Sequence, residues 1–427
     1  MTGVLRIRAF RDLWFGQTVS QFGDAVYGML FIYMADKVTK NPAVVGLVAA
    51  LAALPFLIVG PFAGVVADRV DRRKVMLAAD LLSALILGGF VFVLTRWPVP
   101  PVWTILVTPF FLSVVNSFFM PARGAALPRL VPEDRLLEAN SLSSSTMHLM
   151  NNAGLILAGV VLAPLEAADP QRFFTYAVLV NMATFLVSAW FVYRLPPLVP
   201  ERGGDDLKHW SDDLKEGGKA VWARPALRTM MAANLVVNLA IAGFMVVYTA
   251  TNRAWFGGDF RSLAVIELTF TVPLVVASLL VGKANVTRVG VAYAVCLGAV
   301  GVCVAAMGFA RELWLYGLFN ATCGLVIPFA SIPAMTYMSL AVPDAIRGRV
   351  QSVATMVTAG VQPLGAGLTG LGLKGLGLTG MYVVMGVGTA LPGVFALLLS
   401  PEFRRATVPS GSGRVEGEVA ADPVEGG

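Results

Sequence analysis

Long uncharged runs alternate with short charged segments along almost the whole chain. Ala43 to Ala67 contains no charge, and Val75 to Thr95 contains only Asp80. Each run exceeds the roughly 20 helical residues that cross the hydrocarbon core of a bilayer. Between the two runs, nearly every residue from Asp68 to Lys74 is charged. The pattern predicts two membrane helices joined by a short charged turn in water.

The same length criterion, applied to every apolar run of the chain, predicts an all-α integral membrane protein with twelve transmembrane helices. The spans are expected to begin near Asp12, Ala43, Val75, Val102, Ser141, Phe173, Ala226, Ser262, Val289, Leu313, Val350 and Gly377. The longest polar segment divides them into six and six. We therefore predict an N-terminal half at residues 1–195, a cytoplasmic linker at 196–225, a C-terminal half at 226–400 and a disordered cytoplasmic tail at 401–427.

An internal repeat supports this division. The sequence VPEDRLLEANSL begins at Val131, after the fourth span, and VPDAIRGRVQSV begins at Val342, after the tenth. An offset close to half the chain indicates two pseudo-symmetric six-helix halves. Transporters built from such repeats place the substrate between them, near the middle of the membrane.

Composition agrees with a membrane protein. The chain is 57% hydrophobic and 14% charged, whereas a soluble domain is about 25% charged. Its Lys and Arg residues gather in the loops on the side of the N-terminus, which predicts that both termini are cytoplasmic in a multi-pass protein of the cell (inner) membrane. This loop bias accounts for the net charge of +6, so nucleic-acid binding is not supported.

Catalytic and cofactor chemistry find little support. Cys296, Cys303 and Cys323 lie in apolar runs without metal-ligand spacing, and His148 and His209 are the only histidines. No P-loop is present, and no Ser or Cys nucleophile has a recognisable base. We expect no enzyme activity, cofactor or metal site. The expected partners are a small organic substrate, protons and the lipid bilayer, with the protein monomeric.

The charged turn resembles the signature hinge between helices 2 and 3 of major facilitator superfamily transporters. Its matching residues are Gly64, Asp68, Arg69, Arg72 and Arg73. Asp71 replaces the second glycine of the usual pattern. That departure, and the opening FRDLWFGQTVSQFGD from Phe10, are similar to the drug-exporter branch that contains macrolide-efflux proteins and the enterobactin exporter.

The resemblance implies a secondary active transporter that works by alternating access. Within the drug-exporter branch we expect proton-coupled efflux of drug-like or siderophore-like molecules. An importer or uniporter of a small metabolite is the first alternative. A non-transporting membrane protein or membrane-embedded enzyme is the second. By the same resemblance, Asp80 belongs to the inner gate, and Asp68 is expected to meet the start of helix 11 near Arg347 to Gln351.

Three carboxylates fall inside predicted spans, where burying a charge is costly and therefore indicates function. Asp24 lies midway along the first span, with Gln17 and Gln21 on the same helical face. Because burial disfavours the charged form, Asp24 could exchange a proton during transport. The alternative is a satisfied polar contact between helices. Glu267 is a second proton-coupling candidate, although its place near the outer end of the eighth span slightly favours a plain interfacial glutamate.

Neutral polar residues at membrane depth are candidates for a substrate cavity, and each could instead make an interhelical hydrogen bond. With Gln17 and Gln21 they are Asn116, Asn152, Asn234, Asn238 and Asn320. Arg123, in FFMPARGAALP at the end of the fourth span, is expected at the cytoplasmic surface.

Overall fold

The computed structural model is helical almost throughout the residues that it describes. Its one β-type pairing there is an isolated bridge between Arg288 and Thr407. The described residues are 3–132, 135–157, 163–199, 215–281, 286–342 and 344–407. Most of the predicted linker and tail, at residues 200–214 and 408–427, lies outside them.

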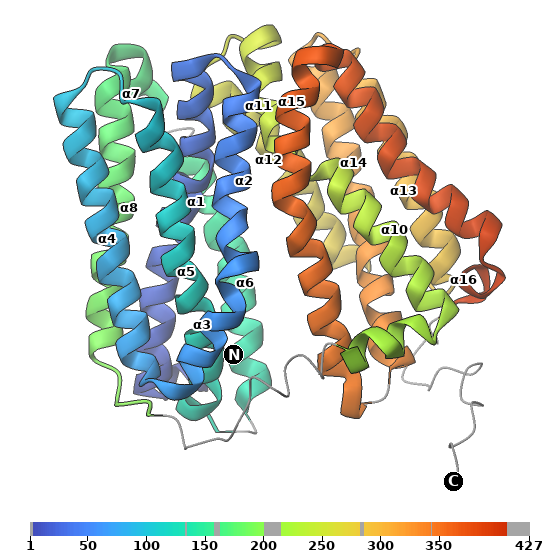
Figure 1. Ribbon diagram of the computed structural model, residues 1–427, viewed down its shortest axis with the longest axis horizontal. Helices are drawn as coiled ribbons and strands as arrows, with labels where there is room; N and C mark the ends of the chain where they lie inside the picture. Colours follow the sequence, from blue (N-terminus) through green and yellow to red (C-terminus); the bar gives the residue numbers. More distant parts are fainter. Residues whose placement is uncertain are drawn as a thin grey trace. The chain divides into compact units, whose positions relative to one another are not determined.

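The chain folds into two compact units (Figure 1). The first comprises Met1–Leu207, Ala242–Leu268 and Gln362–Leu378, and the second comprises Lys208–Ile241, Thr269–Val361 and Thr379–Gly427. The first unit therefore includes pieces of helices from the second half of the sequence. The predicted boundary between halves, at residues 196–225, stays a prediction.

The first unit is a bundle in which α1 packs against α6 and α8, α4 packs between α5 and α8, and α2 packs on α5. Its helices are α1 (Arg8–Thr39), α2 (Pro42–Ile58), α3 (Gly60–Arg69), α4 (Arg72–Arg96), α5 (Val102–Leu130), α6 (Leu136–Leu157), α7 (Ala163–Ala168), α8 (Pro170–Tyr193) and α11 (Phe244–Trp255), with parts of α12 (Phe260–Val281) and α15 (Asp344–Leu399). We call the end with the α3–α4 turn the hinge end, and the end with the α1–α2 turn the far end.

The second unit contains the remaining parts of α12 and α15, which run through both units. Its other helices are α10 (Pro225–Ile241), α13 (Val289–Met307), α14 (Leu313–Ala341) and α16 (Pro401–Arg405). Within it, α13 packs against α14, and the short α16 lies against α10 and α13. Phe403 of α16 is fully buried in this contact.

The predicted twelve spans are confirmed by these helices and by the fold comparison given below. Eight described helical stretches are long and apolar enough to cross a membrane by composition, and the longest, Met356–Leu399, contains a break at Gly377. That glycine has φ 66° and ψ −179°, which is non-helical and favours glycine. The break separates the eleventh span from the twelfth.

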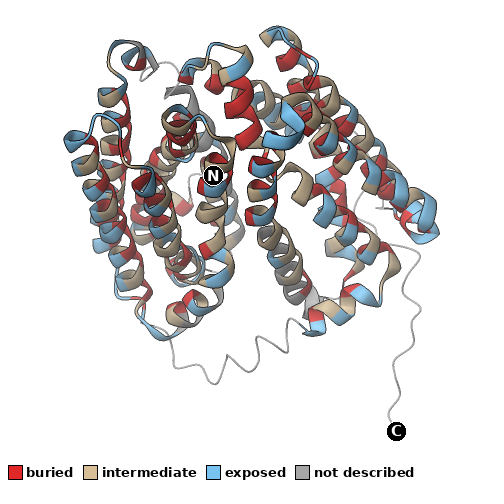
Figure 2. Ribbon diagram, turned by 45° about the horizontal axis from the view of Figure 1, so that its top comes forward, coloured by how far each residue is buried: buried red, intermediate tan, exposed pale blue. Residues whose placement is uncertain are grey.

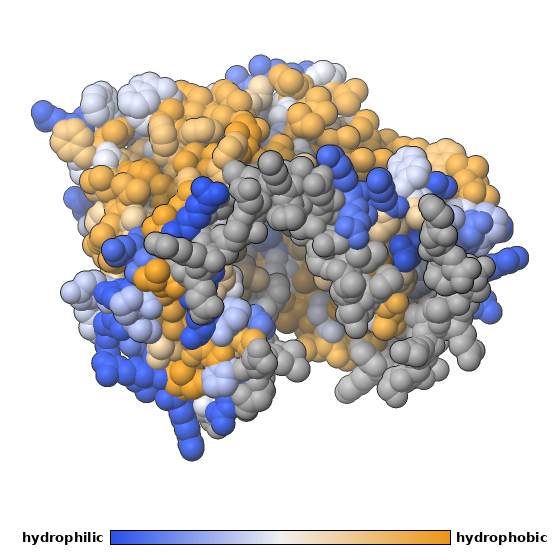
Figure 3. Space-filling model, turned by 60° about the horizontal axis from the view of Figure 1, so that its bottom comes forward, coloured by the Kyte–Doolittle hydropathy of each residue, from blue (hydrophilic) through white to orange (hydrophobic). Residues whose placement is uncertain are grey.

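Buried residues lie on the inward faces of the helices in each unit (Figure 2). Hydrophobic side chains cover much of the visible surface, and hydrophilic ones form smaller groups among them (Figure 3). Leu85 of α4 and Leu279 of α12 are 71% and 76% exposed. Large apolar side chains exposed along helices are typical of a surface that faces lipid, as in a membrane protein.

Candidate functional site

The charged turn between α3 and α4 is held by Asp71, the residue that departs from the family pattern. Its carboxylate accepts hydrogen bonds from the backbone N–H of Arg73 at 3.0 Å and of Leu198 at 3.0 Å. Asp71 is therefore the N-cap of α4, a role that glycine fills less well because it has no side-chain acceptor. The same carboxylate ties the segment after α8 to the turn.

Arg72 fastens the turn to the first unit. Its side chain is 9% exposed and donates to the carbonyl of Ala67 in α3 at 3.2 Å and to that of Ala125 in α5 at 3.0 Å. Arg73 lies over the ring of Tyr193 and donates to its carbonyl. Arg72 and Arg73, two of the predicted motif residues, thus stabilise the turn between α3 and α4.

The structure describes only some of the other residues predicted to form the hinge. Arg69 is exposed, and a Cβ at Gly64 would meet no described atom within 4 Å. The side chains of Asp68, Arg347 and Gln351 lie outside the described residues. The expected contact of Asp68 with helix 11 therefore stays a prediction.

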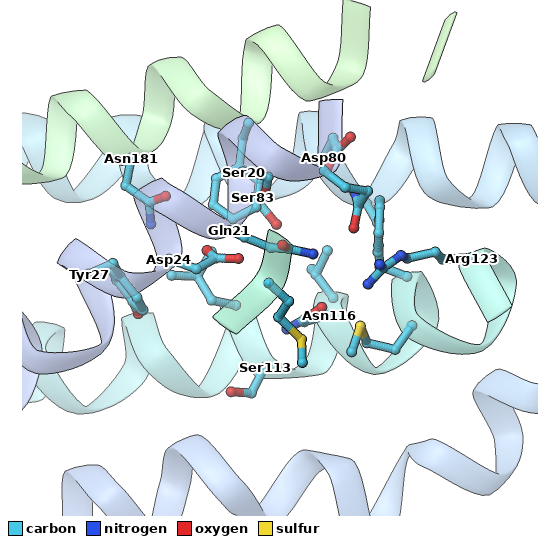
Figure 4. Close-up of a pocket in the computed structure, with 18 residues that line it drawn as sticks. Ser20, Gln21, Asp24, Tyr27, Asp80, Ser83, Ser113, Asn116, Arg123 and Asn181 are labelled. Carbon is cyan, nitrogen blue, oxygen red and sulfur yellow. The ribbon is translucent and has the colours of Figure 1, made fainter. Parts of the chain in front are cut away.

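Helices of the first unit enclose a cavity of about 280 Å³ that brings together residues from α1, α4, α5, α6 and α8 (Figure 4). Four residues that the sequence singled out as cavity or proton-coupling candidates line it: Gln17, Gln21, Asp24 and Asn116. Asp80 lines it as well. Phe119, Met120, Met147 and Phe185 supply apolar walls, so charged, amide and apolar groups share one space.

Asp24 sits where α1 and α8 approach closely. A Cβ at the neighbouring Gly23 would lie 2.5 Å from Oδ1 of Asn181 and 2.1 Å from Oγ1 of Thr184, so only glycine permits this spacing. Tyr27 and Asn181 lie on the same side of the cavity as Asp24 (Figure 4). This packing holds the carboxylate within the bundle rather than in a loop.

Three buried polar atoms around Asp24 have no hydrogen-bond partner among the described residues. They are Oε1 of Gln21, the hydroxyl of Tyr27 and Nδ2 of Asn181. Buried polar groups are normally satisfied, because leaving one unpaired costs about 1–3 kcal/mol. An acceptor, a hydroxyl and a donor that share a cavity wall are suited to a polar ligand or a proton path.

Asp80 is 2% exposed and accepts a hydrogen bond from Oγ of Ser188 at 2.7 Å. It lies about two turns into α4, which begins at Arg72. Arg123 was expected at the membrane surface, and that expectation was wrong: Arg123 is half-buried and lines the cavity from α5 (Figure 4). The correction follows from α5 continuing to Leu130.

The other predicted site residues lie elsewhere. Glu267 is half-buried on α12 and is not among the residues lining the cavity. In the second unit, Asn234 lines a cavity of about 430 Å³ with Met230, Met335 and Thr358, and donates to Oγ1 of Thr358 at 3.2 Å.

Two more asparagines of that unit make hydrogen bonds between helical residues. Asn238 donates to Oδ1 of Asn234 at 2.9 Å. Asn320 is 1% exposed and donates from α14 to Oγ1 of Thr269 on α12 at 3.1 Å. Neither is among the lining residues of the described cavities. The side chain of Asn152 lies outside the described residues.

A polar cluster that sequence reasoning missed joins helices at the far end of the first unit. Glu166 of α7, only 6% exposed, accepts from Nζ of Lys37 at 3.0 Å, from the hydroxyl of Tyr33 and from the backbone N–H of Phe260 at 2.8 Å. Lys37 also donates to the carbonyl of Gly258 at 3.2 Å. The cluster joins α1 and α7 to the start of α12.

Two further contacts belong to the same end. Asp36 of α1 pairs with Arg253 of α11. Where α2 meets α15, a Cβ at Gly46 would lie 3.0 Å from Cα of Gly370 and 2.7 Å from the carbonyl oxygen of Ala366. Charges that read as ordinary loop residues in the sequence are thus used to hold helices together. Their pairing could not be found without the fold, since the partners lie far apart in the sequence.

Comparison with known proteins identifies the class of this twelve-helix chain. The family model described as Major Facilitator Superfamily matches residues 13–366. The chain therefore belongs to the major facilitator superfamily, and it is a transporter and not an enzyme.

The chain is similar to several named transporters. Macrolide efflux protein A of Streptococcus pyogenes is 23% identical over 364 residues, covering 83% of this chain and 87% of that protein. The protein of the same name from Enterococcus faecalis is 22% identical over 319 residues, covering 73% of this chain and 95% of that protein. The crystal structure of the nucleoside transporter NupG has a TM-score of 0.71 at 11% identity, covering 91% of this chain and 99% of that one. At that identity the likeness concerns the fold alone.

Proposed function

We propose that this transporter exports drug-like or siderophore-like organic molecules and couples export to protons through Asp24. The observation that supports coupling is the position of Asp24 on the cavity, with no cation in ion-pairing contact among the described residues. The similarity to macrolide efflux proteins supports the direction of transport. Alternating access of the predicted halves at residues 1–195 and 226–400 would expose the cavity to each side in turn.

A carboxylate without a counter-ion at membrane depth favours binding a proton, because its charged form is poorly solvated there. Protonation removes the charge before the site is closed to both sides, and water on the opposite side favours its release. Moving one elementary charge through a membrane potential of 100 mV is worth about 2.3 kcal/mol. Full coupling to one proton would therefore support roughly a fifty-fold substrate gradient.

The test is uptake of a dye or macrolide into proteoliposomes driven by an imposed pH gradient. Asp24→Asn mimics the protonated form, so it should still bind and exchange substrate while failing to concentrate it. Asp24→Glu, which keeps a titratable group, should retain part of the accumulation. Accumulation by Asp24→Asn equal to that of the parent at every pH would reject Asp24 as the coupling group, and Glu267 would become the next candidate.

We also propose that the hinge end of the first unit faces the cytoplasm, and that both chain termini are cytoplasmic. The two ends of α1 provide matched exposed positions, Arg8 and Lys40. An impermeant maleimide added to intact cells should label Lys40→Cys but not Arg8→Cys until the membrane is opened. The reverse labelling pattern would overturn the orientation.

A further inference from the structure

Arg123 stands where two cavities of the first unit meet. The cavity around Asp24 and a second cavity of about 270 Å³ share four lining residues: Gln17, Met120, Arg123 and Met147. The second cavity continues along α1, α5 and α6, where Phe10, Leu127 and Asn140 line it. A molecule extending from one cavity into the other would pass the guanidinium of Arg123.

The charge of Arg123 has no counter-ion within the part of the chain that the structure describes. The ion pairs found there involve other cations, and Asp80, a carboxylate on the same cavity, accepts a hydrogen bond from Ser188. A guanidinium has five N–H donors and no acceptor. A half-buried cation of this kind needs acceptor oxygens, and a bidentate acid group is the ligand that fits its geometry.

Asp24 lies toward the opposite end of the cavity, beside Tyr27 and Asn181 (Figure 4). The cavity therefore presents a carboxylate toward one end and a guanidinium toward the other (Figure 4), and its apolar lining residues include Phe119, Met120 and Met147. Specificity in such pockets comes from a few polar groups placed in an apolar wall. The arrangement selects for a ligand that carries opposite charges separated by an apolar body.

We propose that Arg123 binds an acid group of the transported molecule, so that the substrates are amphoteric compounds with an amine directed to Asp24 and a carboxylate directed to Arg123. This inference rests on the proposed function, because it assumes that the cavity receives the substrate. It assigns to Arg123 a role in choosing the substrate, separate from the proton coupling assigned to Asp24.

A different role for Arg123 makes a different prediction. If Arg123 served only to pair with Asp80 in another state of the transporter, its removal would affect all substrates alike. If it binds the acid group, its removal should matter only for molecules that carry one. A pair of probes that differ in that group alone separates the two roles.

The experiment measures binding of two dyes to the purified protein in detergent by fluorescence anisotropy. Rhodamine B carries a delocalised cation and a carboxylate, and its ethyl ester lacks the acid. Arg123→Met should weaken binding of the acid dye roughly 10- to 100-fold, the value of a lost charged hydrogen-bonding group. It should leave binding of the ester within about twofold, and Arg123→Lys should recover part of the acid binding because it keeps the positive charge.

Arg129→Met is the matched control, since Arg129 is an exposed cation on the same helix that donates to the carbonyl of Val199. It should bind both dyes like the parent. Equal weakening of both dyes by Arg123→Met, no change in either, or failure of the parent to bind the acid dye would each overturn the proposal. Because binding is read without a gradient, a failure of proton coupling at Asp24 would leave this result interpretable.

Discussion

Replacing Glu166 by glutamine should loosen the far end of the first unit. The carboxylate has two oxygens and receives three donors: Lys37 and Tyr33 on Oε1, and the backbone N–H of Phe260 on Oε2. Glutamine keeps one acceptor oxygen and adds an NH₂ group. In either orientation of the amide, its NH₂ group therefore faces a group that donated to Glu166: the N–H of Phe260 in one, and Lys37 and Tyr33 in the other.

The size of the effect follows from this geometry. If the amide NH₂ faces Phe260, a backbone N–H in a fully buried position loses its acceptor, which costs about 1–3 kcal/mol. The ion pair with Lys37 is lost as well, but Lys37 is 44% exposed, so water screens it and its contribution is below about 1 kcal/mol. We expect the substitution to favour separation of α7 from α1 and the start of α12 by about 2–3 kcal/mol. This is roughly a 30- to 150-fold shift in the equilibrium between the packed and the separated arrangement.

Labelling of a buried cysteine would measure this separation. Leu263 is fully buried, one turn after Phe260 on α12, and the three native cysteines can be replaced by alanine. In nanodiscs, the rate of maleimide labelling at Leu263→Cys should rise 30- to 150-fold when Glu166→Gln is added. Glu312→Gln, at an exposed position in the second unit, is the control and should leave the rate unchanged. An unchanged rate in Glu166→Gln would refute the assignment of Glu166 as a closing contact.

Three further changes test other contacts. Gly370→Val should also speed labelling of Leu263→Cys, because its Cβ would lie 2.5 Å from the carbonyl of Pro42; a slower rate would contradict it. Asp71→Ala should lower the stability measured by thermal unfolding by about 1 kcal/mol through loss of the α4 cap, with Asp71→Asn restoring most of it. Asp68→Asn should keep expression but slow liposome transport, and normal flux would count against the hinge contact.

Helix existence could be predicted from the sequence because a bilayer fixes the length of an apolar run. Breaks within the runs could not. The hydropathy of Ala43 to Ala67 is continuous, yet α2 ends at Ile58 and α3 begins at Gly60. Pro61 explains the break physically, since it lacks the N–H that would continue the hydrogen-bond ladder of α2. A hydropathy average does not register the loss of one donor.

The grouping of Gln17, Gln21 and Asp24 was accessible from helical periodicity, which places positions separated by three, four and seven residues on one face. Periodicity says nothing about which helix lies opposite. The approach of α8, with Asn181 and Thr184 against Gly23, comes only from the packed structure. The same limit applies to Glu166, whose partners Tyr33 and Phe260 are distant in the sequence.

Arg123 shows how a boundary error becomes a functional error. When the span is taken to end near Arg123, a cation there belongs to the surface, where it needs no partner. The helix instead continues to Leu130, and at 1.5 Å per residue the extra seven residues place Arg123 about 10 Å inside its end. At that depth it lines the same cavity as Asp80 and Asp24. Extending one helix by two turns thus turns a solvated loop charge into a half-buried one, and a charge held away from water requires a ligand of opposite sign.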